Sequence, residues 1–280
     1  MRRIGVIPNI SKDRDLKYTG SITGWITERG CEPLLPSGVF LAGCKTLGDG
    51  RFYGESDIIL VLGGDGSMLR AAGQAALYRK PIFGINLGTL GFLTDADKAD
   101  GFAALDAVLS GRFTAEKRMM ISLDGGLIAL NDICVNRGLM SRMISIIVCV
   151  NGEYAETIRA DGLIVSTPTG STAYNLSAGG PILKPDSEMI AITAVCPHEL
   201  FHRPWVVSAE DSVTLRLTDS SGNAVVSLDG QPRADLLPGR PVEIRRSEYY
   251  TTILKTKSLN FYEILRKKMG VSGLENKEAL

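Results

Sequence analysis

Apolar and polar positions follow one pattern before about residue 118 and a different pattern after it. In the first part, continuous apolar runs are separated by amphipathic stretches, which is typical of strands buried on both faces and connected by helices. Strands are predicted at Arg3 to Pro8, Ile58 to Leu62 and Pro81 to Asn86, and helices at Leu16 to Arg29 and Gly101 to Leu109. Strands that alternate with helices predict a mostly parallel sheet.

Beyond residue 118 the segments are short, rich in β-formers and separated by turn signals such as Asp124-Gly125 and Asn151-Gly152. This pattern predicts an all-β, sandwich-like domain. The strands it predicts are 119–123, 127–137, 143–150, 153–158, 162–166, 189–196, 204–207, 212–218, 224–228, 241–246 and 250–254. A helix is expected inside this domain from Ala173 onward, and another at Asn260 to Met269.

We therefore expect a chain of α/β plus all-β class with three parts. Residues 1–117 form a Rossmann-like α/β domain, and residues 118–256 form a β-rich domain. The tail, 257–280, is expected to form a helix that packs back on the first domain or on a partner subunit.

Composition narrows the class of protein. The 280 residues carry a formal net charge of zero, which gives no sign of binding to nucleic acid or to an anionic membrane. No signal peptide is expected at the N-terminus, and no apolar run approaches the roughly 18–20 residues of a spanning helix. Five widely spaced cysteines without a C-x-x-C pair predict a reduced, cytoplasmic protein. No acid or cysteine ligands at a suitable spacing accompany His198 and His202, so no zinc site is predicted there.

The first candidate site follows the apolar run that ends at Leu62. Gly63-Gly64, Asp65 and Gly66 lead into a helical stretch. Glycines let a ligand approach the backbone closely, and free N–H groups at a helix start attract anions, so this layout suits phosphate. An acid there would repel phosphate unless it holds a metal or takes a proton. The alternative is a tight strand-to-helix turn capped by Asp65 or Ser67.

The second candidate site is the dense stretch from Arg159 to Pro181. Its centre, Thr167-Pro-Thr-Gly-Ser-Thr, is a hydroxyl-rich loop that opens a helix, and Tyr174 follows. Hydroxyls and free N–H groups at one helix start suit the polar parts of a nucleotide. The alternative is a well-capped junction between loop and helix.

Together these segments resemble the NAD kinase family. The segments that carry the resemblance occur in the family's order: Gly63 to Ser67, Asn86 to Asp95, Ala129 to Asp132, Asp161 to Gly180 and Asp229 to Gln231. The resemblance implies an N-terminal α/β domain, a C-terminal β-rich domain and a homodimer or homotetramer with active sites completed between subunits. It also implies phosphorylation of the adenosine-ribose 2′-hydroxyl of NAD by ATP, which makes NADP.

Carried onto this chain, the resemblance makes Asp65 the catalytic acid–base residue. Gly66 would contact the nucleotide through its backbone, and Phe92 would line the adenine side. Asn131 and Asp132 would bind the acceptor ribose and the nicotinamide half; position 132 departs from the family, which usually has Glu. Further NAD contacts would come from Arg159, Asp161, Thr172, Ala173, Tyr174, Asn175, Leu176, Ser177 and Gln231.

Three points stay open at this level. Arg70 and Arg142 either reach the phosphates or lie on solvated surfaces. The donor is ATP alone or also polyphosphate, with its charge neutralised most simply by Mg²⁺, and the family favours NAD over NADH as acceptor. A phosphofructokinase- or lipid-kinase-like enzyme and a non-catalytic NAD sensor are the competing functions. A sugar-phosphate kinase should show a second acidic motif, which we do not find, and a sensor needs no base at position 65.

Overall fold

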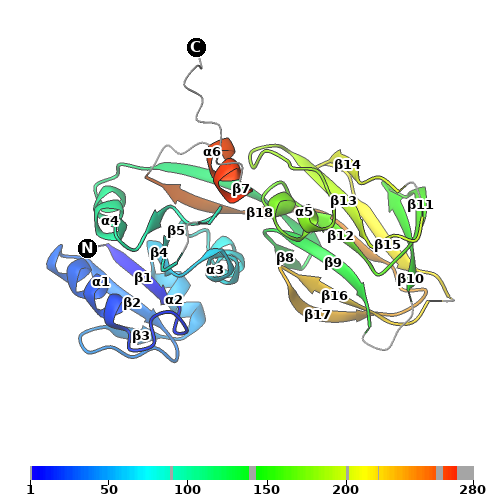
Figure 1. Cartoon of the computed structure of the whole chain (residues 1–280). Helices are drawn as coiled ribbons and strands as arrows, with labels where there is room; N and C mark the ends of the chain where they lie inside the picture. Colours follow the sequence, from blue (N-terminus) through cyan, green and yellow to red (C-terminus); the bar gives the residue numbers. More distant parts are fainter. Residues whose placement is uncertain are drawn as a thin grey trace, which may run out of the picture. The chain divides into compact units, whose positions relative to one another are not determined.

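The computed structural model describes residues 2–88, 91–138, 143–199, 202–219, 221–256 and 261–269. By its internal contacts the chain divides into two units, one formed by Met1–Glu116 with Thr252–Leu280 and the other by Lys117–Thr251 (Figure 1). The boundaries fall near one end of β7 (Thr114–Leu123) and near one end of β18 (Val242–Lys255).

The first unit contains a parallel sheet with the strand order β3-β2-β1-β4-β5, and β5 also pairs with β6 and with Ile253 of β18. Every residue of β4 and of β5 is buried, as expected for strands that are covered on both faces. The strands are β1 Arg3–Pro8, β2 Glu32–Pro36, β3 Lys45–Leu47, β4 Ile58–Leu62, β5 Ile82–Asn86 and β6 Ala96–Asp97.

Helices cover both faces of this sheet. On one face, α1 (Lys17–Glu28) and α4 (Gly101–Leu109) join a core cluster with the even-numbered positions of β4. On the other face, Phe52 of α2 (Asp49–Glu55) and Met68 of α3 (Asp65–Leu77) lie against the backbones of Gly5 and Gly84. The last helix, α6 (Phe261–Lys268), also belongs to this unit.

The second unit holds two antiparallel layers. One is a six-stranded sheet with the order β14-β13-β12-β9-β16-β17, and the other has the order β11-β10-β15-β18, with β8 pairing β7 and β7 pairing β18. Their strands are β8 Leu127–Ala129, β9 Asp132–Arg137, β10 Ile144–Val150, β11 Glu153–Ala160, β12 Gly162–Ser166, β13 Met189–Val195, β14 Trp205–Ser208, β15 Val213–Leu217, β16 Ala224–Leu228 and β17 Gln231–Leu236.

One apolar core joins the two layers of this sandwich. Ile146 of β10 and Leu215 of β15 meet Leu163 and Val165 of β12 in the same cluster. Ile164 points to the opposite face of β12, yet it is also fully buried. That outer face is covered by a short 3₁₀ turn, Gly170–Thr172, and by α5, Tyr174–Ser177 (Figure 1).

The predicted fold class is confirmed, a parallel α/β part followed by an antiparallel β part, although several predicted elements were wrong. The segment 127–137 is two strands, because the backbone at Leu130 and Asn131 bonds to a side chain instead of to a neighbouring strand. The segments 241–246 and 250–254 form one continuous strand, β18, and the helix from Ala173 is a single turn. Elements β3, α2, β6 and β17 were not predicted. Within the described residues, no helix is both long and apolar enough to cross a bilayer.

Candidate functional site

The carboxyl ends of β1, β4 and β5 place polar residues around one cavity in the first unit. β1 lies between β2 and β4, so the strand order of the sheet reverses its direction at this point. Parallel sheets have a crevice beyond the carboxyl ends of the strands at such a switch point. The cavity measures about 360 Å³. Its lining residues are Asn9, Lys12, Gly64, Asp65, Gly66, Ser67, Arg70, Asn86, Gly91 and Lys268.

Asp65 is the only acid among these lining residues, and two backbone amides fix its carboxylate. The N–H of Phe92 donates to Oδ2 at 2.8 Å, and the N–H of Leu93 donates to Oδ1 at 3.0 Å. A side chain at Gly91 would overlap the carboxylate, so only glycine allows this close approach. Asp65 is also the first residue of α3, where the free N–H groups of the helix lie.

Positive charge surrounds this acid. Lys12, Arg70 and Lys268 all line the cavity. Arg70 donates from Nη2 to Ser67 Oγ at 3.2 Å, and Asn9 donates from Nδ2 to the same oxygen at 2.9 Å. The structure therefore brings Arg70 to the cavity, where its guanidinium together with the start of α3 can attract a phosphate group.

The oxygen atoms at the cavity suit a magnesium ion carried by a nucleotide. Mg²⁺ is usually held by one or two carboxylates together with substrate phosphates. The carboxylate of Asp65 and the amide oxygen of Asn86 are oxygen ligands of the kind that suits this ion. The Asn86 oxygen also accepts a hydrogen bond from the N–H of Gly88 at 2.8 Å. The residues present fit an ion that takes most of its ligands from the phosphates.

In the second unit, the predicted residues Asn131 and Asp132 stand at the start of β9 and are held by another aspartate. Asp229, in the turn between β16 and β17, accepts backbone N–H groups from Leu130, Asn131 and Asp132 at 2.9, 2.7 and 3.2 Å. The N–H of Asp229 in turn donates to the carbonyl of Asp132 at 3.0 Å. Burial raises the pKa of Asp229, and this effect exceeds the lowering by the three amides.

Asp132 has a buried carboxyl whose ionisation is disfavoured. Its side chain lies inside the second unit, and the residue is only 4% exposed. Burial is the largest cause of a pKa raised to about 6. The nearby negative charge of Asp229 raises the pKa further. The thiol of Cys134, which donates a hydrogen bond to Oδ1 at 3.3 Å, lowers it. Asp132 is therefore an acid whose pKa lies well above the usual value for aspartate.

The hydroxyl-rich loop is tied to the backbone of Leu130 and Asn131, directly before Asp132. The N–H of Thr167 donates to the carbonyl of Asn131 at 2.8 Å, and Thr167 Oγ1 donates to the carbonyl of Leu130 at 2.6 Å. Thr172, Ala173 and Tyr174 follow this anchored loop, so they lie on the same outer face of the six-stranded sheet as the short helix α5. Tyr174 is exposed, at 42% for the residue as a whole, and its ring suits stacking.

Asn175 differs from its neighbours because the protein uses its whole amide. Its Nδ2 donates to the carbonyls of Ser171 at 3.1 Å and Pro181 at 2.9 Å, and its Oδ1 accepts from Thr193 Oγ1 at 2.7 Å. The side chain is fully buried. Asn175 therefore holds the loop on β13.

The remaining predicted residues are dispersed. Leu176 and Ser177 complete α5, Arg159 is exposed on β11, and Gln231 is exposed at the start of β17. Asp161 pairs with Arg137, with 2.8 Å between Oδ1 and Nε. In the first unit, Gly66 lines the cavity and the ring of Phe92 packs on that of Phe261, with 6.4 Å between centroids. Arg142 lies outside the described residues.

Asn9, Lys12 and Asn86 line the cavity but were not predicted as site residues from the sequence. Asn9 and Lys12 follow β1, and Asn86 ends β5, so all three stand where parallel strands meet at one edge. Their position after predicted strands was a usable signal. Lys268 comes from α6, far along the chain, and nothing in the sequence pattern places it near the strand ends.

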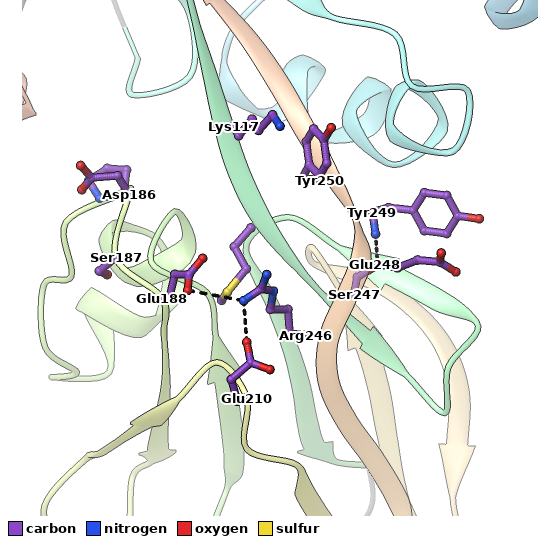
Figure 2. Close-up of a pocket in the computed structure, with 12 residues that line it drawn as sticks. Lys117, Asp186, Ser187, Glu188, Glu210, Arg246, Ser247, Glu248, Tyr249 and Tyr250 are labelled. Carbon is purple, nitrogen blue, oxygen red and sulfur yellow. Dashed lines mark hydrogen bonds and ion pairs between the residues drawn. The ribbon is translucent and has the colours of Figure 1, made fainter.

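A second cavity, of about 540 Å³, contains none of the predicted site residues (Figure 2). Arg246 lies between Glu210 and Glu188, with Nη1 at 2.7 and 3.5 Å from their carboxylate oxygens (Figure 2). Nearby, Lys117 lies over the ring of Tyr250, with Nζ 4.5 Å from its centroid. Because carboxylates already surround Arg246, this cavity is poorly suited to phosphate.

Comparisons with known proteins agree with this geometry. Residues 49–113 match the ATP-NAD kinase N-terminal domain, and residues 130–256 match the ATP-NAD kinase C-terminal domain. The chain is 42% identical to the NAD kinase of Thermoanaerobacter sp. (strain X514), with 96% of this chain and 99% of the relative covered. Among solved structures, an NAD kinase from Archaeoglobus fulgidus in complex with ATP has a TM-score of 0.77 at 27% identity, covering 96% of this chain and 97% of the other. Yeast NADH kinase complexed with NADH has a TM-score of 0.86 at 22% identity, covering 99% and 90%, and supports the fold.

Proposed function

The chain belongs to the NAD kinase family, and from this premise we propose that Asp65 is the acid–base residue with which it makes NADP from NAD and ATP. The observation that carries the proposal is the cavity at the end of β4. There a single carboxylate, oriented by two backbone amides, stands among cationic side chains at the start of a helix. The competing sugar-kinase, lipid-kinase and sensor functions have no comparable support.

The reaction requires a base because a ribose hydroxyl is a weak nucleophile at neutral pH. As the 2′-oxygen of the adenosine ribose attacks the terminal phosphorus of ATP, the bond from that phosphorus to ADP breaks and the 2′-hydroxyl proton passes to Asp65. Lys12, Arg70 and Lys268 attract the donor phosphates, and Gly64 and Gly66 leave room for them. A magnesium ion, held by Asp65 or Asn86 and the phosphates, would neutralise charge on the transferred group.

In the second unit we propose that Asn131, Asp132 and the loop from Thr172 to Ser177 bind NAD. Asn131 supplies donor and acceptor groups, which suit a carboxamide or a diol. The carboxylate of Asp132 suits ribose hydroxyls, and the exposed ring of Tyr174 suits stacking on a base. Asn175 acts here as a positioning residue, because its amide is already bonded within the protein.

A coupled assay of NADP formation from NAD, ATP and Mg²⁺ tests the proposal. We expect Asp65→Asn to lower kcat by roughly 10²- to 10⁴-fold, the usual scale for an acid–base group. Asp49→Asn is the matched control, because Asp49 is likewise the first residue of its helix, α2, but does not line the cavity. Wild-type turnover by Asp65→Asn would remove the assigned role. The same assay defines the phosphoryl donor when polyphosphate replaces ATP, and the acceptor when NADH replaces NAD. Chelation of Mg²⁺ in this assay tests the need for the metal.

Two broader properties complete the proposal. Family membership supports self-association as a homodimer or homotetramer, which sedimentation of the purified chain tests. The five cysteines are free, which supports a reducing, cytoplasmic location.

A further inference from the structure

The imidazole of His202 is buried without a hydrogen-bond partner. Its side chain is only 5% exposed, and among the described residues neither ring nitrogen finds a donor or an acceptor. The ring lies in a small, mostly apolar pocket with Val148, Ile158, Ile192 and Trp205. A buried polar group in this state costs about 1–3 kcal/mol, so the position calls for a ligand.

Two glutamates face this imidazole from separate parts of the second unit. Glu156 is on β11, the last strand of its layer, while Glu199 and His202 both lie between β13 and β14 of the six-stranded sheet. Nδ1 of His202 is 3.8 Å from Oε1 of Glu156, too far for a hydrogen bond. One ligand atom from each of the three side chains lies within 4.8 Å of the other two.

We propose that Glu156, Glu199 and His202 form a site for one divalent transition-metal ion of the zinc type. Zinc binds imidazole nitrogen and carboxylate oxygen at about 2.0–2.2 Å, so tetrahedral ligand atoms lie roughly 3.4 Å apart. The observed 3.8 Å between Nδ1 and Oε1 is close to that separation. Two carboxylates balance the charge of the ion, and the orphaned imidazole gains the partner that it lacks. An imidazole ligand favours zinc over magnesium, which prefers oxygen.

The topology gives the ion a structural consequence. β11 packs against β13, but the two strands belong to different layers of the sandwich. An ion held by Glu156 on one side and by Glu199 and His202 on the other would connect the layers at this edge. None of the three residues lines the cavity of Asp65, so the inference does not depend on the proposed function.

The test uses the full chain, stripped of metal by a chelator and kept reduced. Calorimetric titration with Zn²⁺ should give the wild type one more bound equivalent than His202→Asn, and Zn²⁺ should raise the thermal midpoint of the wild type only. Both proteins retain all five cysteines, so the difference isolates this site. The matched controls are His198→Asn, the other histidine and an exposed one, and Glu153→Gln, an exposed glutamate of the same strand, β11. Both should bind like the wild type, and Mg²⁺ should not displace the extra ion.

If His202→Asn fails to fold, Glu199→Gln replaces it, because Glu199 is exposed and its loss leaves the core intact. We expect this change to weaken Zn²⁺ binding by at least about 100-fold. Loss of a residue that only supports a ligand costs up to about 100-fold in metal affinity, and Glu199 is proposed as a direct ligand. Equal stoichiometry and equal thermal shift in the wild type and the His202 or Glu199 variant would overturn the proposal. A zinc-edge absorption spectrum showing sulfur neighbours would also overturn it, since it would assign the ion to cysteine.

Discussion

Asp65 and Asp229 use the same local chemistry in two different surroundings. Each is a partly buried aspartate beside glycine whose carboxylate accepts backbone N–H groups, two for Asp65 and three for Asp229. Asp65 opens onto a cavity lined by cations, whereas Asp229 does not line that cavity and directs its carboxylate at backbone amides. The amides alone therefore do not separate a reactive acid from a structural one.

The difference lies in what the free side of each carboxylate meets. Asp65 keeps an open side toward a space that can hold phosphates, so its orientation by Phe92 and Leu93 serves a ligand. Asp229 turns its oxygens toward Leu130, Asn131 and Asp132, so it positions two predicted NAD residues without facing an identified cavity. We infer that Asp65 governs rate and that Asp229 governs stability and placement.

The sharpest way to break this comparison is to remove each carboxylate and measure both properties. Asp229→Ala leaves three backbone amides without an acceptor, so we expect the free energy of unfolding to fall by about 3 kcal/mol. Asp65→Ala should change it by less than about 1 kcal/mol, because water in the cavity replaces the lost acceptor. Thermal unfolding measures the first effect, and hydrogen exchange at residues 130–132 reports it locally. Equal destabilisation by the two changes would contradict the distinction.

A second prediction concerns the orientation of Asp65. Gly91→Ala places a methyl group on the carboxylate and pushes it from its amides, so we expect kcat/KM for NADP formation to fall by about 10²-fold, the cost of a misplacement near 1 Å. Gly73→Ala is the control, because Gly73 lies in α3 with no atom within 4 Å of an added Cβ. If Gly91→Ala keeps the wild-type rate, the amides are not needed to orient the acid.

The pKa of Asp132 gives a prediction for the second unit. Because its pKa is raised to about 6, the folded state binds the proton more tightly than the unfolded chain, so stability falls as pH rises from about 4 to about 6 and then levels off. Asp132→Asn removes this ionisation, so we expect the free energy of unfolding at pH 8 to rise by roughly 1–2 kcal/mol. The upper limit is about 3 kcal/mol, because a pKa shift of about two units corresponds to that free energy. We also expect the variant to bind NAD more weakly.

Unfolding measured at pH 4 and at pH 8 checks this prediction. The gain should vanish at pH 4, where the wild-type carboxyl is protonated in the folded state. Glu153→Gln on the exposed start of β11 serves as the control and should show no such pH dependence. A gain that is equal at both pH values would mean that packing, not ionisation, separates Asp132 from asparagine.

The sequence predicted elements well where burial alone decides them. The strand Ile58–Leu62 and the helix Gly101–Leu109 occur at the predicted residues, because a continuous apolar run and an apolar helix face need no distant partner to be recognised. The helix α2 escaped prediction because Gly50 and Gly54 weaken its pattern, and only Phe52 and Tyr53 of this helix are buried. The helix α2 therefore depends on tertiary packing against the sheet.

The candidate site shows the same limit. Asp65 could be predicted because strand, glycines and helix start are contiguous in sequence. The positioning role of Asp229 could not, because it bonds residues almost a hundred positions earlier, and the strand after it, β17, is exposed over most of its length and contains Pro232. The metal cluster was rejected for lack of nearby ligands, since only the folded sandwich brings Glu156 to His202.

The smallest expected effect lies in the turn that presents Asp229. Gly230 has φ +75°, a conformation that costs an L-residue about 1 kcal/mol, so Gly230→Ala should destabilise the chain by about that amount. Gly230→Asn should cost less, because asparagine tolerates left-handed backbone. Gly126→Ala, in the β7–β8 turn at an ordinary φ, should be neutral. If the alanine and asparagine variants at 230 unfold at the same temperature as the wild type, the turn does not hold Asp229 in place, and the backbone amides of 130–132 themselves fix the carboxylate.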